Sequence, residues 1–461
     1  MTRAHWGTRF GFVLAAAGSA VGLGNIWKFP YIAGQNGGGA FVLVYLVFVA
    51  TIGLPIMVAE VMIGRTTQKS PIGAFRELAG RRSPWTLVGA LGVLAAFLVL
   101  SYYAVVAGWA MHYTVLSARG AFAGEDPAAS AAVFGETAGS SGISIGWHLA
   151  FMALTVWVVM GGVQKGIERA SRILMPLLFL MLLVLLGKAF FTEGFGKAGD
   201  FVFGSHTDKL TTAGVLEALG HSFFTLSLGL GGMLTYGSYL DRKADLLRGS
   251  IAITVLDTVV ALLACMILFP ITFSYGMEPA AGPGLVFVNM PVALGQMPGG
   301  SAFAVIFFGL VVFAALTSSI SILEVVASYL IDERGWTRRR AAISAGVAIA
   351  IFGIPSALSG STHLFGEGVG SWSRGVFGES VTSWFDVVDH LVSNWMLPLG
   401  GMGIALFCAW RIPEGRRFEE FNRTRRLVNA YRAWMFFLRF LVPVAIAAVF
   451  LNKLGLLDRF V

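Results

Sequence analysis

The first long apolar run of this chain contains the stretch Gly18-Ser-Ala-Val-Gly22-Leu-Gly24-Asn25-Ile-Trp-Lys28-Phe-Pro30. Three glycines within seven residues, followed by asparagine and proline, weaken helical hydrogen bonding at this point. A later apolar run repeats the pattern with Ser227-Leu-Gly229-Leu-Gly231-Gly232. We therefore predict two helices that are each broken near their middle.

The composition around these breaks is that of a polytopic membrane protein. Of the 461 residues, 56% are hydrophobic and only 13% are charged, with a mean hydropathy of +0.76. Soluble proteins carry about 25% charged residues. A helix needs about 20 apolar residues to cross a bilayer. We predict an all-α fold with about eleven spans, which start near residues 10, 40, 85, 146, 170, 215, 246, 302, 340, 384 and 432.

Several classes of protein are excluded by the same sequence. Cys265 and Cys408 lie in apolar runs, so neither a disulfide framework nor a thiol metal site is expected. The seven histidines show no paired metal or haem spacing, and no Ser/His/Asp set suggests itself, so we do not expect an enzyme. The net charge of +8 does not indicate a nucleic-acid partner, because the basic residues form short clusters between apolar runs.

The basic clusters predict the orientation in the membrane. Twenty-four of the 33 Lys and Arg residues fall in alternate connections that begin with the N-terminus, and seven fall in the opposite ones. Positive charge marks the cytoplasmic side. We expect a multi-pass protein of the inner (plasma) membrane with its N-terminus in the cytoplasm and, after an odd number of spans, its C-terminus outside. Residues Met1–Arg9 do not resemble a cleaved signal peptide.

The paired breaks indicate a transport site. Backbone groups freed in mid-membrane cannot face lipid, since each unsatisfied group costs several kcal/mol. Interrupted spans at matching places of two halves are typical of a binding site between inverted repeats. We predict one transmembrane domain over residues 1–461, with five-span repeats at about 8–190 and 213–411 and an extra helix at about 431–452. The spacing of Gly18 and Gly22 also fits close helix packing, which remains an alternative for either motif alone.

An ordered set of motifs resembles the neurotransmitter:sodium symporter family, in its bacterial amino-acid transporter branch. The matches run over residues 3 to 411: His5-Trp6-Gly-Thr-Arg9 through Gly37-Gly-Gly-Ala-Phe41, Glu60 to Arg65, Lys165-Gly-Ile-Glu-Arg169, Phe223-Phe-Thr-Leu-Ser-Leu-Gly229 to Tyr239, and Ala315-Leu-Thr-Ser-Ser319 with Asp332. The resemblance implies sodium-coupled import of an amino acid by alternating access. The family usually has twelve spans, whereas we expect eleven in this chain.

The resemblance also implies two sodium sites. The first uses the Ala20 carbonyl, Asn25, Thr225 and Asp257, completed by the carboxylate of the substrate. Because ion and substrate share that carboxylate, each raises the affinity for the other. The second uses the carbonyls of Gly18, Val21 and Ala314 with the hydroxyls of Thr317 and Ser318. Alternatively, the hydroxyls of Thr225, Thr317 and Ser318 bond only to a preceding carbonyl.

Asp257 lies in an apolar span, where a carboxylate is a functional candidate by default. Chloride-dependent relatives carry a neutral Asn at this position. The fixed charge of Asp257 is expected to replace the anion, so no chloride requirement is expected, and a protonated Asp257 could carry H⁺ outward. His221 stands where those relatives have Gln; a packed neutral histidine is the alternative to a role in that proton's chemistry.

The expected substrate follows from Gly22, which stands where amine transporters of the family carry Asp. An amino acid brings its own carboxylate, so glycine suffices. The resemblance places the substrate among Ala20, Gly22, Leu23, Gly24, Val99, Tyr103, Phe224, Thr225, Ser227, Leu230, Ser318 and Ile322. This lining has no charge, which favours a hydrophobic or aromatic amino acid. Leu230 replaces a bulkier Phe; a small amino acid such as alanine or glycine remains the alternative.

Two gates are implied. Outside, Lys28 would pair with Asp389, with Asp386 as a competing partner, while Tyr103 and Phe224 close over the substrate. Inside, Arg3 would pair with Asp332, helped by Tyr239 and Trp6. Simple interfacial charge is the alternative for the inner pair.

A helix primed to unwind between Gly166 and Pro176 would open the inner side; a static proline kink is the alternative. Rival functions are a carrier driven by protons alone, with Asp257 or Glu60 as relay, and a sensor or channel. We expect Glu60 instead to hydrogen-bond the broken backbone. The expected partners are the amino acid and the bilayer, with the protein as a monomer or a weak homodimer.

Overall fold

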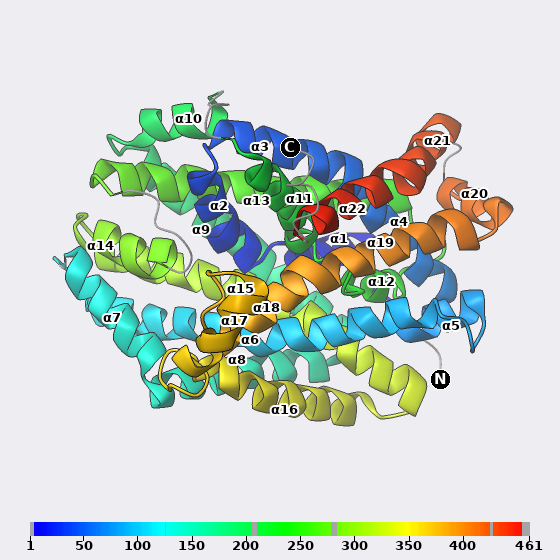
Figure 1. Ribbon diagram of the computed structural model, residues 1–461, viewed down its shortest axis with the longest axis horizontal. Helices are drawn as coiled ribbons and strands as arrows, with labels where there is room; N and C mark the ends of the chain where they lie inside the picture. The colour runs from blue at the N-terminus through cyan, green and yellow to red at the C-terminus, as the bar shows by residue number, and fades with distance from the viewer. Residues whose placement is uncertain (1–3, 125, 205–209, 278–283, 425–426, 454–461) are drawn as a thin grey trace.

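The computed structural model describes residues 4–124, 126–204, 210–277, 284–424 and 427–453. Within these ranges the regular secondary structure is helical and contains no strand. Figure 1 shows the helices packed into one bundle. The first half of the chain forms α1 (Arg9–Ala20), η1 (Gly24–Lys28), α2 (Phe29–Gln35), α3 (Gly39–Phe48), η2 (Val49–Gly53), α4 (Leu54–Thr67), α5 (Pro71–Ala79), α6 (Thr86–Ala118), α7 (Pro127–Gly139), α8 (Ser141–Met160), η3 (Val163–Glu168), α9 (Arg169–Phe190) and α10 (Phe195–Phe203).

The second half forms α11 (Thr212–Thr225), α12 (Gly232–Gly237), α13 (Leu246–Ser274), η5 (Leu285–Asn289), α14 (Met290–Gly295), α15 (Gly300–Arg334), α16 (Arg338–Ala357), α17 (Glu367–Phe377), α18 (Trp384–Leu391), η6 (Val392–Met396), α19 (Leu397–Leu406), η7 (Phe407–Arg411), α20 (Glu414–Asn422), α21 (Val428–Phe436), η8 (Phe437–Leu441) and α22 (Val442–Lys453). The η segments are π-helical turns. Most of them continue a neighbouring helix, so that α18, η6, α19 and η7 together form one span, Trp384–Arg411.

The described residues contain nine helices that are long and apolar enough to cross a membrane, and a tenth span if a bent pair is counted as one. That pair is Arg9–Ala20 with Gly24–Gln35, bent by 47°. The remaining predicted span is the segment that begins near residue 215, which divides into α11 and α12. Both pieces are shorter than a bilayer requires. An all-helical membrane fold is therefore confirmed, while the count of eleven spans stays a prediction.

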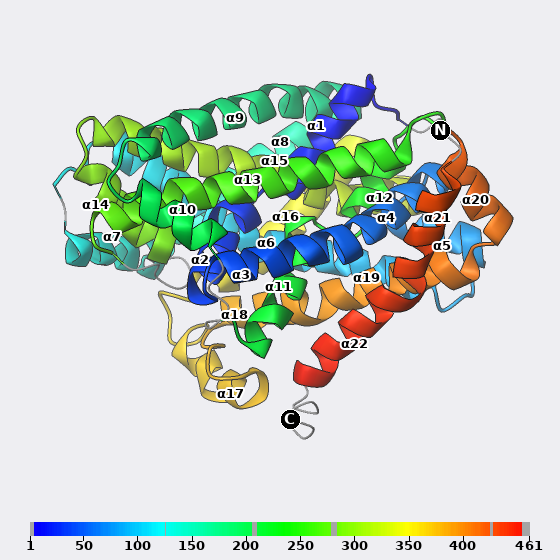
Figure 2. The ribbon, with the colours of Figure 1, turned by 90° about the horizontal axis from the view of Figure 1, so that it is seen from above.

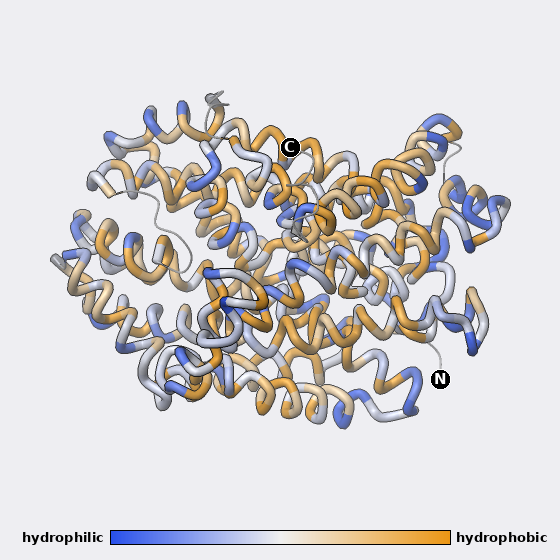
Figure 3. The backbone as a smooth tube through the Cα atoms, viewed as in Figure 1, coloured by the Kyte–Doolittle hydropathy of each residue, from blue (hydrophilic) through white to orange (hydrophobic). Residues whose placement is uncertain are grey.

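The long helices run roughly along the longest axis of the bundle (Figure 2). The short helices α7 and α14 lie at one end of that axis, and α5, α20 and the N-terminal segment lie at the other (Figures 1 and 2). Figure 3 shows apolar residues along the spans and hydrophilic residues gathered near the two ends. This distribution is the one a bilayer imposes on helices that cross it.

The centre of the bundle is formed by α15 and α6, which pack along each other. Two thirds of the apolar window of each is buried, whereas in the Val163–Phe190 span only 28% is buried. Ile173, Leu180 and Leu183 of that outer span face away from the protein. Apolar side chains exposed in this way require a lipid environment. The broken elements α1 and α12 contact both α15 and each other, so the breaks lie inside the protein and not at its surface.

One close approach anchors the second broken helix. A Cβ atom at Gly64 of α4 would lie 1.9 Å from the Leu234 carbonyl oxygen and 2.8 Å from the Ser238 nitrogen, both in or next to α12. Only glycine lets the two backbones come so near, as in the small-residue contacts of other membrane helices. The position of α12 therefore depends on Gly64.

We expect Gly64→Ala to destabilise the protein by on the order of 3 kcal/mol, because backbone atoms must move apart to admit the methyl group. Thermal unfolding of the purified protein in detergent measures this. Gly187→Ala is the matched control, since Gly187 lies within a membrane helix and a Cβ there meets nothing within 4 Å. Equal melting temperatures for the two variants would contradict the packing described for α12.

Candidate functional site

The first break separates α1 from η1. Val21, which follows the last helical residue, is extended at φ −66° and ψ 109°. Beyond it the Gly22 N–H donates to the Asn25 side-chain oxygen at 2.9 Å, and the Leu23 N–H donates to the Tyr103 hydroxyl oxygen at 3.2 Å. Side chains thus replace the helical acceptors that these two groups have lost.

The second break runs from Leu226 to Gly231, between α11 and α12. Its backbone turns through the left-handed region at Ser227 (φ 53°), Gly229 (φ 83°) and Gly231 (φ 79°), a conformation that favours glycine. The Ser227 hydroxyl donates to the Ser19 carbonyl oxygen at 2.9 Å. The two breaks, about 200 residues apart in sequence, are therefore joined directly.

Glu60 of α4 supports the second break. Its carboxylate is fully buried and accepts the Gly229 N–H at 2.7 Å and the Leu234 N–H at 3.2 Å. These donors lie on the two sides of Gly231, so one side chain bonds to the backbone before and after the break. The structure thus shows the hydrogen-bonding role expected of Glu60.

Three oxygen-bearing side chains meet beside the first break. Asp257 of α13 accepts from the Asn25 amide nitrogen at 2.7 Å and from the Thr225 hydroxyl at 3.1 Å, and Asn25 also donates to Thr225 at 3.1 Å. All three residues are buried. A carboxylate, a hydroxyl and an amide carbonyl are the hard ligands that suit a sodium ion. The Asn25 oxygen accepts the Gly22 N–H at 2.9 Å and, because it has two lone pairs, keeps one for an ion.

The second expected ion site lies where α1 faces α15. A Cβ atom at Gly18 would be 3.1 Å from the Thr317 Cβ, so these residues are in contact. The Thr317 hydroxyl donates to the carbonyl oxygens of Phe313 and Ala314, at 3.1 and 3.0 Å. Thr317 therefore bonds to preceding carbonyls, which is the alternative to ion binding given above. It also lies beside Gly18, where the second ion site is expected.

Val21 and Ser318 complete that expected ion site. Val21 is buried beside the first break. Ser318 faces Gly22, with its Oγ 3.3 Å from a Cβ built on that glycine. Ser318 also lines the cavity between the two breaks.

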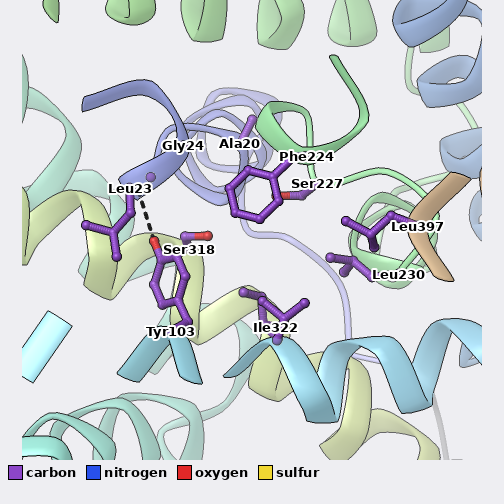
Figure 4. A pocket seen from close by; sticks show the side chains of 12 residues that line it. Ala20, Leu23, Gly24, Tyr103, Phe224, Ser227, Leu230, Ser318, Ile322 and Leu397 are labelled. Carbon is purple, nitrogen blue, oxygen red and sulfur yellow. Dashed lines mark hydrogen bonds between the residues drawn. The ribbon is translucent and has the colours of Figure 1, made fainter. Parts of the chain in front are cut away.

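A cavity with a volume of about 20 Å³ lies between the breaks (Figure 4). It is lined by Ala20, Gly22, Leu23, Gly24, Val99, Tyr103, Phe224, Ser227, Leu230, Ser318, Ile322 and Leu397. Eleven of these were expected from the sequence. The twelfth expected residue, Thr225, turns instead toward Asp257. Leu397 was not anticipated, because nothing in its sequence neighbourhood marks it.

Gly22 is required by the crowding around the cavity. A Cβ atom there would lie 2.8 Å from the Tyr103 hydroxyl oxygen and 3.1 Å from the Ser318 Cβ. Any larger side chain would displace Tyr103 from the Leu23 N–H. The polar groups that line the cavity are backbone groups and the hydroxyls of Tyr103, Ser227 and Ser318.

The expected outer pair is formed. The Lys28 ammonium lies 3.5 Å from the Asp389 carboxylate and 4.5 Å from the centre of the Phe224 ring. Asp386, the competing partner, accepts hydrogen bonds from Thr382 and Ser383 instead. Beyond this pair opens a vestibule of about 990 Å³ that Lys28, Phe224, Asp386 and Asp389 help to line.

The expected inner gate is described only in part. Arg3 lies outside the described residues, so its pairing with Asp332 stays a prediction; the Asp332 carboxylate accepts the Ser70 N–H at 2.6 Å. Trp6 donates its ring N–H to the Tyr236 carbonyl at 3.0 Å and packs against Tyr239, with ring centres 6.2 Å apart.

A buried carboxylate, Glu324, was missed. It accepts from the Tyr239 hydroxyl and pairs with the Arg338 guanidinium through two bonds, of 2.7 and 3.0 Å. A glutamate within an apolar run is the signal that should have identified it, as it did Glu60.

Two further expected elements can be placed. His221 stacks on Phe29 with ring centres 5.5 Å apart, and neither of its ring nitrogens has a hydrogen-bond partner among the described residues, as for a packed histidine.

Gly166 lies in η3 and Pro176 within α9. Glu168, at the end of η3, accepts the Gly7 N–H at 2.7 Å, so the N-terminal segment is bound to this irregular turn.

Comparison with known proteins agrees with this geometry. The sodium:neurotransmitter symporter family model matches residues 3–127 and 136–365. The chain belongs to the sodium:neurotransmitter symporter family. An uncharacterized sodium-dependent transporter of Bacillus subtilis, YhdH, is 39% identical over 98% of both chains, and human sodium- and chloride-dependent GABA transporter 2 is 27% identical over 79% of this chain and 69% of its own.

A solved structure supports the fold of this symporter. The crystal structure of MhsT in complex with L-phenylalanine superposes with a TM-score of 0.88, at 40% identity, over 98% of this chain and 100% of the other. The family consists of transporters and not of enzymes. The chain is thus a sodium-dependent symporter that crosses the membrane several times.

Replacing Glu60 tests the support of the second break in this symporter. Glu60→Ala leaves two buried N–H groups without an acceptor, each worth roughly 1–3 kcal/mol, and we expect a matching loss of thermal stability. Glu60→Gln keeps one acceptor oxygen and should lose about half as much. If Glu60→Gln melted like the wild type yet lost all transport, the proton-relay role of Glu60 would be favoured instead.

Proposed function

We propose that this protein is a sodium-coupled symporter that imports a hydrophobic or aromatic L-amino acid and needs no chloride. The observation that carries the proposal is the cavity between the two breaks. One end holds the Leu23 N–H, the Tyr103 hydroxyl and Ser318, which suit the carboxylate and ammonium of an amino acid. The other end is apolar, and none of the twelve lining side chains is charged. A charged substrate side chain would lose its solvation there without compensation.

Sodium coupling is supported by how close the oxygen cluster lies to this cavity. Ala20, Phe224 and Ser227 line the cavity, while Asn25 and Thr225, their neighbours in sequence, bond Asp257. An ion held by Asn25, Thr225 and Asp257 lies within reach of a substrate carboxylate at the same break. Binding of either partner then strengthens binding of the other by an equal factor. The second sodium site is proposed for the contact of Gly18 with Thr317.

Chloride independence is proposed from the charge of Asp257. The carboxylate lies within hydrogen-bond distance of Asn25 and Thr225, so its negative charge is already at the ion site. A separate anion is then not needed to balance sodium.

The alternating-access cycle is proposed to run between the two charged gates. The vestibule outside Lys28 and Asp389 leads to the cavity, while Trp6, Tyr239, Glu324 and Arg338 close the opposite side. We assign that opposite side to the cytoplasm, since the connections that contain α5 and α20 lie at the same end as the N-terminal segment (Figure 2) and carry many Lys and Arg residues: Lys69, Arg76, Arg81 and Arg82 around α5, and Arg411, Arg416, Arg417 and Arg423 around α20. The two breaks are proposed to mark inverted repeats at about 8–190 and 213–411 in the plasma membrane, with the chain acting as a monomer or a weak homodimer.

One observation favours a second candidate, a carrier of small amino acids such as alanine or glycine. The cavity measures about 20 Å³, which is close to the room that a single water molecule needs. A substrate such as L-phenylalanine, found with MhsT, requires Leu230, Ile322 or Leu397 to move.

We expect purified protein to bind an apolar amino acid in sodium and not in potassium, and to bind equally well when gluconate replaces chloride. The reason is that the oxygen cluster supplies both the ion ligands and the negative charge. The measurement is the binding of labelled L-phenylalanine, L-leucine and L-alanine in sodium chloride, sodium gluconate, potassium chloride and potassium gluconate. Equal binding in potassium would refute sodium coupling, and loss of binding in gluconate would refute the role given to Asp257.

The matched variant is Asp257→Asn, which keeps the shape and removes the charge. We expect it to bind weakly in gluconate and to recover when chloride is added. An Asp257→Asn protein that binds as the wild type does in gluconate would show that this carboxylate does not replace an anion.

A third variant tests the outer gate. Lys28→Gln leaves Asp389 with its Ser393 partner but without the cation. For a partly exposed ion pair we expect labelled substrate to dissociate about two- to five-fold faster. Lys28→Arg, which can form a two-bonded pair, should dissociate more slowly than the wild type. The dissociation rate is measured by diluting the labelled complex into unlabelled substrate. An unchanged rate in both variants would show that the Lys28–Asp389 pair does not act as a gate.

A further inference from the structure

The apolar end of the cavity has a wall that comes from a distant part of the chain. Figure 4 shows Leu397 beside Leu230, away from the first break and Tyr103. Leu397 is the first residue of α19 and is 1% exposed. It follows the second break by more than 160 residues. The two leucines therefore close one end of the cavity from two different spans.

The backbone at Leu397 is held against the second break. A Cβ atom on Gly229 would lie 2.2 Å from the Leu397 carbonyl oxygen, and one on Gly400 would lie 2.3 Å from the Gly229 carbonyl oxygen. Glycine at both places lets the two backbones touch. Glu60 fixes the same Gly229 through its N–H at 2.7 Å. Because its backbone is pressed against a fixed neighbour, the Leu397 backbone cannot move away from the cavity without separating α19 from the break, and only its side chain can adjust.

Leu230 differs from Leu397 in this respect. It lies within the irregular segment, between Gly229 and Gly231, both at positive φ. A side chain on such a segment can be displaced by a local backbone change, whereas Leu397 lies within the continuous helical span Trp384–Arg411, directly after the turn η6. The pocket thus has one adjustable wall and one fixed wall.

We propose that Leu397 is a specificity-determining residue, whose size sets the largest substrate side chain that the cavity accepts. The proposal rests on the proposed function, since it assumes an amino acid oriented with its side chain toward Leu230 and Leu397. A shorter side chain at position 397 enlarges the cavity at its apolar end alone. It leaves the groups proposed to hold sodium and the substrate carboxylate unchanged.

The test is the ratio of affinities for L-tryptophan and L-alanine in sodium, measured by competition with a labelled amino acid that the wild type binds. We expect Leu397→Ala to shift this ratio toward tryptophan by about tenfold or more, as for removal of several carbons from a hydrophobic pocket. Leu397→Val should shift it in the same direction by less, and Leu397→Phe should shift it toward alanine. The valine variant preserves the packing of α19 best and keeps the test valid if the alanine variant does not fold.

Two controls separate the possible failures. Leu399→Ala changes a side chain of the same helix that is 39% exposed and should leave the ratio unchanged. The sodium affinity measured without substrate should be the same in every variant that binds, since the coupling acts only when both ligands are present. A wild type without any sodium-dependent amino-acid binding overturns the proposed function and the proposal with it. A wild type that binds, with Leu397 variants whose ratio stays within twofold or whose affinities all fall equally, overturns the role of Leu397 alone.

Discussion

The structure depends on one constraint, that no backbone group within a membrane protein can be left without a hydrogen-bond partner. Two helices of this chain are broken in the interior of the bundle, and the donors that they lose are bonded by side chains. Glu60 accepts N–H groups from both sides of the second break, and Asn25 and Tyr103 accept those of the first. Without these acceptors each break would cost several kcal/mol. With them, the breaks become stable walls of a cavity.

The same side chains connect stability with function. Asn25 accepts the Gly22 N–H and also donates to Asp257, so the group that stabilises the first break belongs to the proposed sodium site. Tyr103 bonds Leu23 and lines the substrate cavity. The proposed sodium ion would bind the same Asn25 side chain that holds the Gly22 N–H, so we expect ion binding and the conformation of the first break to be linked.

The two sides of the cavity are closed by charge pairs of unequal strength. Lys28 and Asp389 are joined at 3.5 Å, with side chains 17% and 31% exposed. Arg338 and Glu324 share two hydrogen bonds, the carboxylate is fully buried, and Tyr239 adds a third bond. A two-bonded, buried arginine pair is broken at greater cost than an exposed lysine pair. The vestibule accordingly lies on the Lys28 side.

Local composition determined the class of the protein, the two breaks and most of the candidate site. Glycines, hydroxyl and amide residues and an intramembrane carboxylate are visible in sequence, and the family motifs placed eleven of the twelve cavity residues. The resemblance named Lys28 and Asp389 as a pair, and the tertiary structure showed that this pair forms and that Asp386 is bonded elsewhere. The tertiary structure alone decided that Glu324 meets Arg338 and that Leu397 closes the cavity. Each contact joins different helices, Glu324 and Arg338 on consecutive ones 14 residues apart, and the contact of Leu397 with the second break depends on how closely glycine-lined backbones approach. No periodicity or spacing within a single helix encodes that distance, so only the assembled bundle reveals it.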